Sequence, residues 1–161
     1  MGFQIGDWVV HCAHGLGQIH DIEEKTNNNK TLMYYAIQLN DLTIWVPADD
    51  NQHSRLRPPT SAEDLRRLLA TLSEPAEQLS DDRRQRNLQL LEILKDGKVE
   101  SLCRVLRNLA AYRQRRTWNE YDSALMNRAQ KALVAEWSFV LSIPPHEAEV
   151  ELHRLLSANM N

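Results

Sequence analysis

Residues 31–46 read TLMYYAIQLNDLTIWV, a stretch rich in aromatic and β-branched side chains. Apolar residues at every second position from Met33 to Leu39 share one face, as they do in a strand that is buried on one side. The pair Asn40-Asp41 then separates this run from residues 42–46 by the length of a tight turn. The stretch therefore predicts a β-hairpin.

Two shorter runs of strand character precede this hairpin, WVVH at residues 8–11 and GQIH at residues 17–20. Asparagines at positions 27–29 mark another turn, because asparagine tolerates the left-handed backbone that tight turns need. The Pro58-Pro59 pair ends the region, since proline neither donates to a sheet nor continues a helix interior. Several short strands within the first 57 residues predict a small SH3-like or Tudor-like β barrel.

After Pro59 the apolar side chains recur at helical spacing. The expected helices carry these apolar stripes, in chain order: Leu65, Leu68, Leu69 and Leu72; Leu88, Leu91, Ile93 and Leu94; Val99, Leu102, Val105, Leu106 and Leu109; Leu125, Ala129, Leu133 and Trp137. A short last helix is expected to start at Pro144-Pro145 and to end near Leu156. The predicted fold class is therefore α+β, with a β module over residues 1–57 and an all-helical bundle over residues 60–161.

Capping residues predict where several of these helices begin and end. Thr60 or Ser61 is suited to cap the first helix, and Ser80 the second. Gly97 is expected to stop the second helix, because glycine accepts the left-handed backbone that follows a helix. Overlapping capping signatures within residues 117–122 then begin the fourth helix.

The composition is that of an ordinary globular protein, with 42% hydrophobic and 25% charged residues in 161. No apolar stretch reaches the roughly 18 residues that cross a bilayer, and the first ten residues lack the features of a signal peptide. Cys12 and Cys103 lie far apart, which suits two reduced thiols better than a disulfide. We therefore expect a cytoplasmic protein with no membrane contact.

Charge is distributed unevenly along the chain, although the net charge is only −3. Residues 80–131 hold twelve Lys/Arg against seven Asp/Glu, a balance of +5, whereas residues 1–59 hold four against seven, a balance of −3. An anionic partner responds to such a regional field rather than to the net charge. The segment 80–131 is therefore the candidate for contact with a nucleic acid.

Motifs of catalysis and metal binding are missing from the sequence. No nucleophile with its base, no paired carboxylates and no phosphate loop can be assembled, so we expect no enzymatic activity, small-molecule substrate or cofactor. Gly15 and Gly17 are expected to reverse the chain between two strands. His11, Cys12 and His14 are spaced too tightly for a usual zinc site and have no second ligand pair, so we expect no metal there and a structural or surface role for His14.

Four stretches of the first half resemble a known family in their order and spacing: Phe3-x-x-Gly6-Asp7-x-Val9-Val10, His14-Gly15-x-Gly17-x-Ile19, Ile22-Glu23, and Asp41-Leu42-Thr43-Ile44-x-Val46-Pro47-Ala48. They resemble the N-terminal polymerase-interacting module of CarD/CdnL proteins, which is shared with transcription-repair coupling factors. The second half is similar to the family's helical domain at Arg83, Asn87-Leu88, Gly97, Asp122 and Arg128-Ala129.

The resemblance implies a bacterial transcription factor whose β module binds the β subunit of RNA polymerase, largely through an exposed strand. Pairing at a sheet edge supplies affinity through main-chain hydrogen bonds and specificity through alternate side chains. The expected polymerase-binding residues are Lys25, Leu42, Thr43, Ile44, Trp45, Val46 and Pro47. Two orientations of Trp45 stay open: it faces outward, or it caps the core of the β module. The family often has a basic residue at this position, and Lys25 supplies one at another position that the family uses.

The resemblance also implies contact between the helical half and promoter DNA. Arginine dominates the basic clusters, and its planar fork suits phosphate, so we expect backbone contacts with little base reading. The expected DNA-binding residues are Arg83, Arg84, Arg86, Arg113, Arg115, Arg116 and Arg128. Two other interpretations stay open: the arginines form only a solvated face, and those near position 115 complement a helix dipole.

The chain departs from the family at one position that matters for DNA. Family members commonly place a tryptophan at the start of the second helix, where it acts as a wedge in the opened promoter. Here Ser80 stands in that place, followed by Asp81 and Asp82, which repel phosphate. The chain therefore either lacks the wedge or uses Trp118 differently.

Two functions from different classes remain. In the favoured one, the protein tethers to polymerase and contacts promoter DNA, which changes the stability of the open complex. In the alternative, it is an adaptor that binds polymerase or another sheet edge without contacting DNA.

Overall fold

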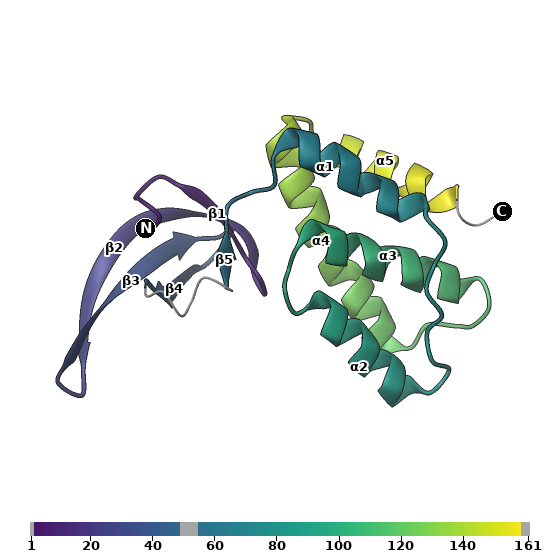
Figure 1. Ribbon diagram of the computed structural model, residues 1–161, viewed down its shortest axis with the longest axis horizontal. Helices are drawn as coiled ribbons and strands as arrows, with labels where there is room; N and C mark the ends of the chain where they lie inside the picture. The colour runs from purple at the N-terminus through teal and green to yellow at the C-terminus, as the bar shows by residue number, and fades with distance from the viewer. Residues whose placement is uncertain (1, 49–54, 159–161) are drawn as a thin grey trace. The chain divides into compact units, whose positions relative to one another are not determined.

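The computed structural model describes residues 2–48 and 55–158 of the chain. A β-sheet is followed by helices, which confirms the predicted α+β class (Figure 1). The chain divides into two compact units, Met1–Pro59 and Thr60–Asn161. We call them the β unit and the helical unit.

The β unit is one antiparallel sheet in the order β4-β3-β2-β1-β5. Its strands are β1 (Trp8–His11), β2 (Gly15–Asn27), β3 (Lys30–Gln38), β4 (Thr43–Pro47) and β5 (Leu56–Arg57). Figure 1 shows β2 and β3 as a long curved hairpin, and the register of this pair shifts between Ile19 and Asp21. Because β4 and β5 are the two edges, the sheet is not closed and matches the expected barrel only loosely.

The expected hairpin and the expected asparagine turn are both present. Asn28 and Asn29 connect β2 to β3 with φ angles of 51° and 63°, and positive φ at both central residues is typical of a type I′ turn. Asn40-Asp41 lies in the turn between β3 and β4, where the Leu39 N–H donates to the Leu42 carbonyl at 2.9 Å. The asparagine signals therefore predicted the turns correctly.

The two glycines of the β1–β2 turn region have different tasks. Gly15 has a φ of 82°, as its expected role in reversing the chain requires. Gly17 does not have a positive φ, but a Cβ there would lie 2.7 Å from Ile37 Cγ2 and 2.9 Å from the Gln38 carbonyl oxygen. Gly17 therefore allows close approach of β2 to β3, and the expectation that it helps to turn the chain is wrong.

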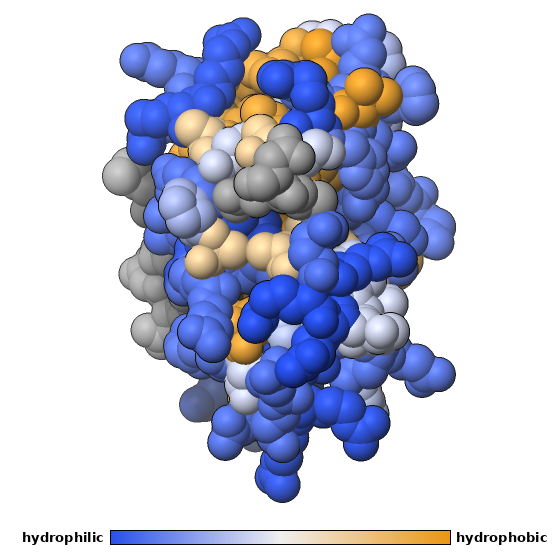
Figure 2. Space-filling view, turned by 90° about the vertical axis from the view of Figure 1, so that its right-hand side faces the viewer, coloured by the Kyte–Doolittle hydropathy of each residue, from blue (hydrophilic) through white to orange (hydrophobic). Residues whose placement is uncertain are grey.

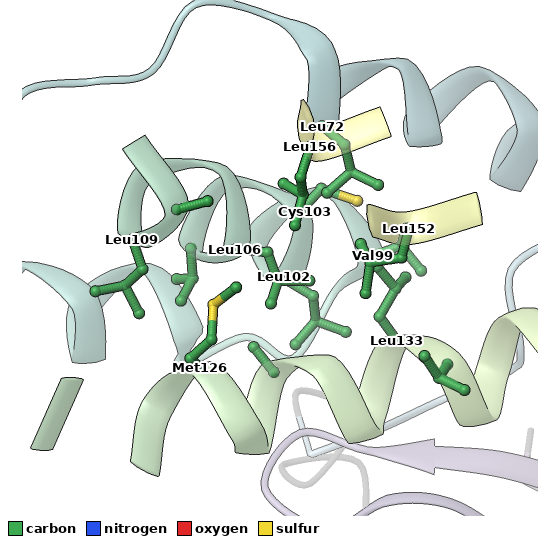
Figure 3. Packing of buried hydrophobic residues seen from close by; sticks show 14 of the residues in the cluster. Leu72, Val99, Leu102, Cys103, Leu106, Leu109, Met126, Leu133, Leu152 and Leu156 are labelled. Atoms are coloured by element: carbon green, nitrogen blue, oxygen red, sulfur yellow. The ribbon is translucent and has the colours of Figure 1, made fainter. Parts of the chain in front are cut away.

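The helical unit buries an apolar core around α3. Its elements are α1 (Ala62–Leu68), the 3-10 helix η2 (Leu69–Ser73), α2 (Arg83–Leu94), α3 (Val99–Arg113), α4 (Glu120–Leu141) and α5 (Pro145–Ser157). Figure 3 shows Leu102 and Leu106 of α3 in one cluster with Met126 and Leu133 of α4 and with Leu152 and Leu156 of α5. Burial of these side chains is the main stabilising contribution of the unit.

Local capping explains most helix starts. Ser61 caps α1, since its Oγ accepts the N–H of Asp64 at 3.2 Å. Asn119 caps α4 in a reciprocal capping box. At α2, however, the cap is Asp82 rather than the expected Ser80, which instead lies in the turn before the helix.

The apolar face of α2 differs from the expected one. The helix buries Arg86, Leu90 and Leu94, whereas Leu88 is 59% exposed and Leu91 is also exposed. The buried positions are four residues apart and form one stripe, so α2 is rotated to place a charged side chain inside the unit. An apolar pattern alone does not reveal this rotation.

Candidate functional site

The expected polymerase-binding stretch lies at an edge of the sheet. Strand β4 pairs with β3 on one side, and the strand order of the described residues leaves its other side unpaired. The main-chain groups of such an edge can pair with a strand of another protein. Leu42, which precedes the strand, is 45% exposed.

The orientation of Trp45 follows from alternation along β4. Val46 is buried and Ile44 packs against the core of the β unit. Trp45 points to the opposite face and is 47% exposed. Of the two open orientations, the structure therefore shows the outward one.

Trp45 is part of a polar and aromatic cluster on this outer face. Its indole Nε1–H donates to Glu23 Oε2 at 3.0 Å. The Lys25 ammonium lies 4.5 Å from the centroid of the Trp45 ring and 5.5 Å from that of Tyr34. The structure thus brings two of the expected polymerase-binding residues together. It adds Glu23, which the sequence placed in a family motif but not in the expected polymerase-binding set, and Tyr34, which the sequence did not single out. Tyr34 could have been found from the sequence, because it lies on the opposite face of the strand from the alternating apolar residues Met33 to Leu39.

Arg86 must be removed from the expected DNA-binding set. Its side chain is almost fully buried, and its Nε and Nη2 each lie 2.9 Å from an oxygen of Asp122. Its Nη1 donates to the hydroxyl of Tyr112 at 3.0 Å. The hydrogen bonds to Asp122 are the main cause that raises the pKa of Arg86. A guanidinium buried and occupied in this way does not reach a phosphate, so this expectation is wrong.

The other arginines near the start of α2 and the end of α3 are exposed. They are Arg83, Arg84, Arg113, Arg115 and Arg116, and we call them the arginine end. The two groups lie close together because Tyr112 of α3 contacts Arg86 of α2, and Arg116 Nε lies 3.8 Å from Asp81 Oδ1. Figure 2 looks onto the side of the helical unit where α2 begins and α3 ends, and this face is mostly hydrophilic.

Among the helices of the described residues, none has the length and apolar character that a membrane span requires.

Aromatic rings support two members of the arginine end. The Arg113 guanidinium lies 4.4 Å from the ring centroid of Trp118, and that of Arg115 lies 5.6 Å from the ring centroid of Tyr112. Trp118 is partly buried against the core, and its Nε1–H donates to the Leu109 carbonyl at 2.9 Å. Trp118 therefore packs against Arg113 and the core, and it does not project from the surface as a wedge for DNA would.

The remaining arginines of the basic segment have other positions. Arg128 is exposed on α4, and none of the contacts above joins it to the arginine end. Arg104 and Arg107 contact Glu77, with Arg104 Nε and Arg107 Nη2 each 2.8 Å from Oε1. Hydrogen bonding from Arg104 is the main cause that lowers the pKa of Glu77 to about 2. This cluster holds the segment before α2 against α3.

The segment Ser80–Asp82 forms a compact turn where the family's wedge was expected. Ser80 Oγ accepts the N–H of Asp82 at 3.1 Å, and the Ser80 N–H donates to Gln89 Oε1 at 2.9 Å. Asp82 accepts the N–H of Gln85 as the cap of α2. The side chains at these positions are therefore used locally, and both carboxylates stay exposed beside the arginine end.

The histidines of the β1–β2 turn also have structural contacts. His11 Nδ1 accepts the N–H of Ala13 at 3.0 Å and that of His14 at 3.2 Å. Burial, with smaller contributions from His14 and Arg55, lowers the pKa of His11. Across the described ranges 2–48 and 55–158, no three His, Cys, Asp or Glu side chains are arranged to hold a metal ion.

Comparison with known families covers most of the chain. Residues 3–60 match the CarD-like/TRCF RID domain, and residues 67–153, more than half of the chain, match the CarD C-terminal domain. The chain belongs to the CarD family. This family is of a transcription-factor type, so the role of the protein is associated with transcription, and its RID domain implies an interaction with RNA polymerase.

One curated relative of the chain has a similar length. It is a Bacillus subtilis (strain 168) protein described as "Putative transcription factor YdeB". The two are 25% identical over 143 residues, which cover 88% of this chain and 94% of that protein. The CarD RID match falls on the β unit with its edge strand, and the CarD C-terminal match includes both groups of the arginine end.

Proposed function

We propose that this CarD-family protein tethers itself to the β subunit of RNA polymerase through its β unit and contacts promoter DNA through its helical unit, thereby changing the stability of the open complex. The observation that carries the DNA part is the arginine end, because arginines about 30 residues apart in sequence meet at one place on the unit. The edge strand β4 supports the polymerase part.

On the polymerase side, strand pairing would supply affinity and the outer face of β4 would supply specificity. Trp45 and Lys25 lie side by side on that face and offer both an apolar and a cationic contact. The tryptophan is held in place by its hydrogen bond to Glu23. A held aromatic ring loses little entropy on binding, so Trp45 is our candidate for the largest single contribution.

On the DNA side, the arginine end would contact phosphates and read few bases. Asp81 and Asp82 oppose the same phosphates, so the affinity for free DNA is expected to be weak. Tethering to polymerase makes the second contact intramolecular, which lets a weak contact suffice. Arg128 stays in the proposed interface as an exposed arginine of the same unit.

The alternative is an adaptor that binds polymerase or another sheet edge without contacting DNA. Its support is that one member of the arginine end, Arg116, already has a carboxylate partner, Asp81, at 3.8 Å. In this case the arginines are only a solvated face.

A salt titration separates the two functions. The full-length protein, with and without polymerase, is titrated with DNA duplexes of unrelated sequence. The change Arg83→Ala/Arg84→Ala/Arg113→Ala should lower the affinity about equally for all sequences and reduce the salt slope by about 1 for each phosphate that is no longer neutralised. The matched control is Arg66→Ala/Arg67→Ala/Arg154→Ala, which removes three exposed arginines of α1 and α5. If the triple variant behaves like the control, the adaptor function is the better one.

A capture experiment tests the polymerase contact. Trp45→Ala in the full-length protein should weaken capture of the β subunit, whereas Leu88→Ala, an exposed apolar residue of the helical unit, should not. Equal capture by both variants would exclude the outer face of β4 from the contact.

A further inference from the structure

We infer that Arg86 and Tyr112 form an internal brace that positions the arginine end, so that its two groups of arginines meet DNA together. Neither residue needs to touch the nucleic acid. The inference rests on the proposed function and names the residues on which that surface depends.

Arg86 joins the start of α2 to three other parts of the helical unit. Its guanidinium donates to both oxygens of Asp122 on α4 and to the hydroxyl of Tyr112 on α3. Nη1 also donates to the carbonyl oxygens of Ser80 and Asp81, at 3.0 and 3.3 Å. One buried side chain therefore holds the turn before α2 and fixes it against α3 and α4.

The first turn of α2 has no other buried side chain. Within the helix only Arg86, Leu90 and Leu94 are buried, and the two leucines lie one and two turns further along. Arg83 and Arg84 are exposed on that first turn. Their position relative to α3 thus depends on Arg86 rather than on apolar packing.

Tyr112 is the residue of α3 that contacts Arg86. Its hydroxyl accepts from Arg86 Nη1 and lies 3.4 Å from Asp81 Oδ1. The ring of Tyr112 has the Arg86 guanidinium 4.5 Å and the Arg115 guanidinium 5.6 Å from its centroid. The Tyr112 side chain therefore contacts both the buried Arg86 and the exposed Arg115.

The test is Tyr112→Phe in the full-length protein, because it removes the hydroxyl and keeps the buried ring. DNA affinity in the presence of polymerase should fall by up to about fivefold, because the loss cannot exceed the net contribution of one hydrogen bond, about 1 kcal/mol. The same change is then made in the Arg83→Ala/Arg84→Ala background, where the α2 arginines that the brace positions are gone. In that background Tyr112→Phe should have little further effect on DNA affinity. A general loss of stability would instead lower DNA affinity equally in both backgrounds.

The outcomes separate this inference from the proposed function. If Arg83→Ala/Arg84→Ala leaves DNA affinity unchanged, the part of the proposed function that places these two arginines on DNA fails. If that variant binds more weakly but Tyr112→Phe has no effect, or an equal effect in both backgrounds, the brace is overturned. Should Tyr112→Phe not fold, as judged by circular dichroism, Arg86→Lys takes its place in the same cycle with the same criteria. Lysine keeps the charge beside Asp122 but has no planar fork for the remaining partners.

Discussion

Arg86 on α2 and Asp122 on α4 form a two-point ion pair inside the helical unit, with two N···O distances of 2.9 Å. Both residues are buried, at 2% exposure. The Asp122 carboxylate also accepts the N–H of Asn119 and so completes the capping box of α4. Each partner compensates a charge that would otherwise be buried alone.

Arg86→Met should therefore destabilise the protein by about 3–5 kcal/mol, since it leaves the Asp122 carboxylate buried without its cation. Urea unfolding followed by circular dichroism measures this loss. Arg84→Met, at an exposed position of the same helix, should change the unfolding free energy by no more than about 0.5 kcal/mol. Similar values for the two variants would contradict the proposed role of the ion pair.

Glu77 predicts a pH dependence of stability. Its pKa is lowered from 4.5 to about 2 in the folded state, chiefly by hydrogen bonding from Arg104. The carboxylate therefore stabilises the fold above pH 4.5, and this contribution is lost as the pH falls through about 2. Because the group is partly exposed, we expect only about 1 kcal/mol at pH 7. The difference in unfolding free energy between wild type and Glu77→Gln should shrink towards zero with acidification, and a constant difference would refute this origin.

Gly17→Ala should destabilise the β unit by about 1–3 kcal/mol through overpacking. The added Cβ would lie 2.8 Å from Leu39 Cδ2 and 2.9 Å from the Gln38 carbonyl oxygen. Leu39→Ala removes only the first of these contacts, so it should not rescue the stability of Gly17→Ala in a double variant. Full rescue, measured by denaturant unfolding, would show that the main-chain contact is unimportant.

The two cysteines should differ in reactivity. Cys103 is buried in the helical unit, and burial raises the pKa of its thiol to about 12. Because the thiolate is the nucleophile, iodoacetamide at pH 8 should leave Cys103 unmodified in the folded protein and modify it in urea. Cys12 is only partly buried and should react first. Mass spectrometry of timed samples measures both rates, and equal rates in the folded state would contradict the burial of Cys103.

The sequence by itself determined the α+β class, the turns and several helix starts. The turn at Asn28 and Asn29, the stop at Gly97 and the cap at Asn119 each depend on a few adjacent residues. Local backbone preference and local hydrogen bonding decide such features, so they can be predicted without knowing what the segment packs against. The family resemblance predicted the edge strand in the same way, from contiguous motifs.

Only the tertiary structure decided which arginines are exposed and can contact a partner. Arg86 stands in an arginine cluster and is predicted to be exposed, yet its partner Asp122 is 36 residues away. The rotation of α2 that joins them also exposes Leu88 and Leu91. A buried charge is stable only with a compensating partner, and the packing of α2 on α4 brings that partner close. The arginine end arises in the same way, since contacts between α2 and α3 join two clusters that are separate in the sequence.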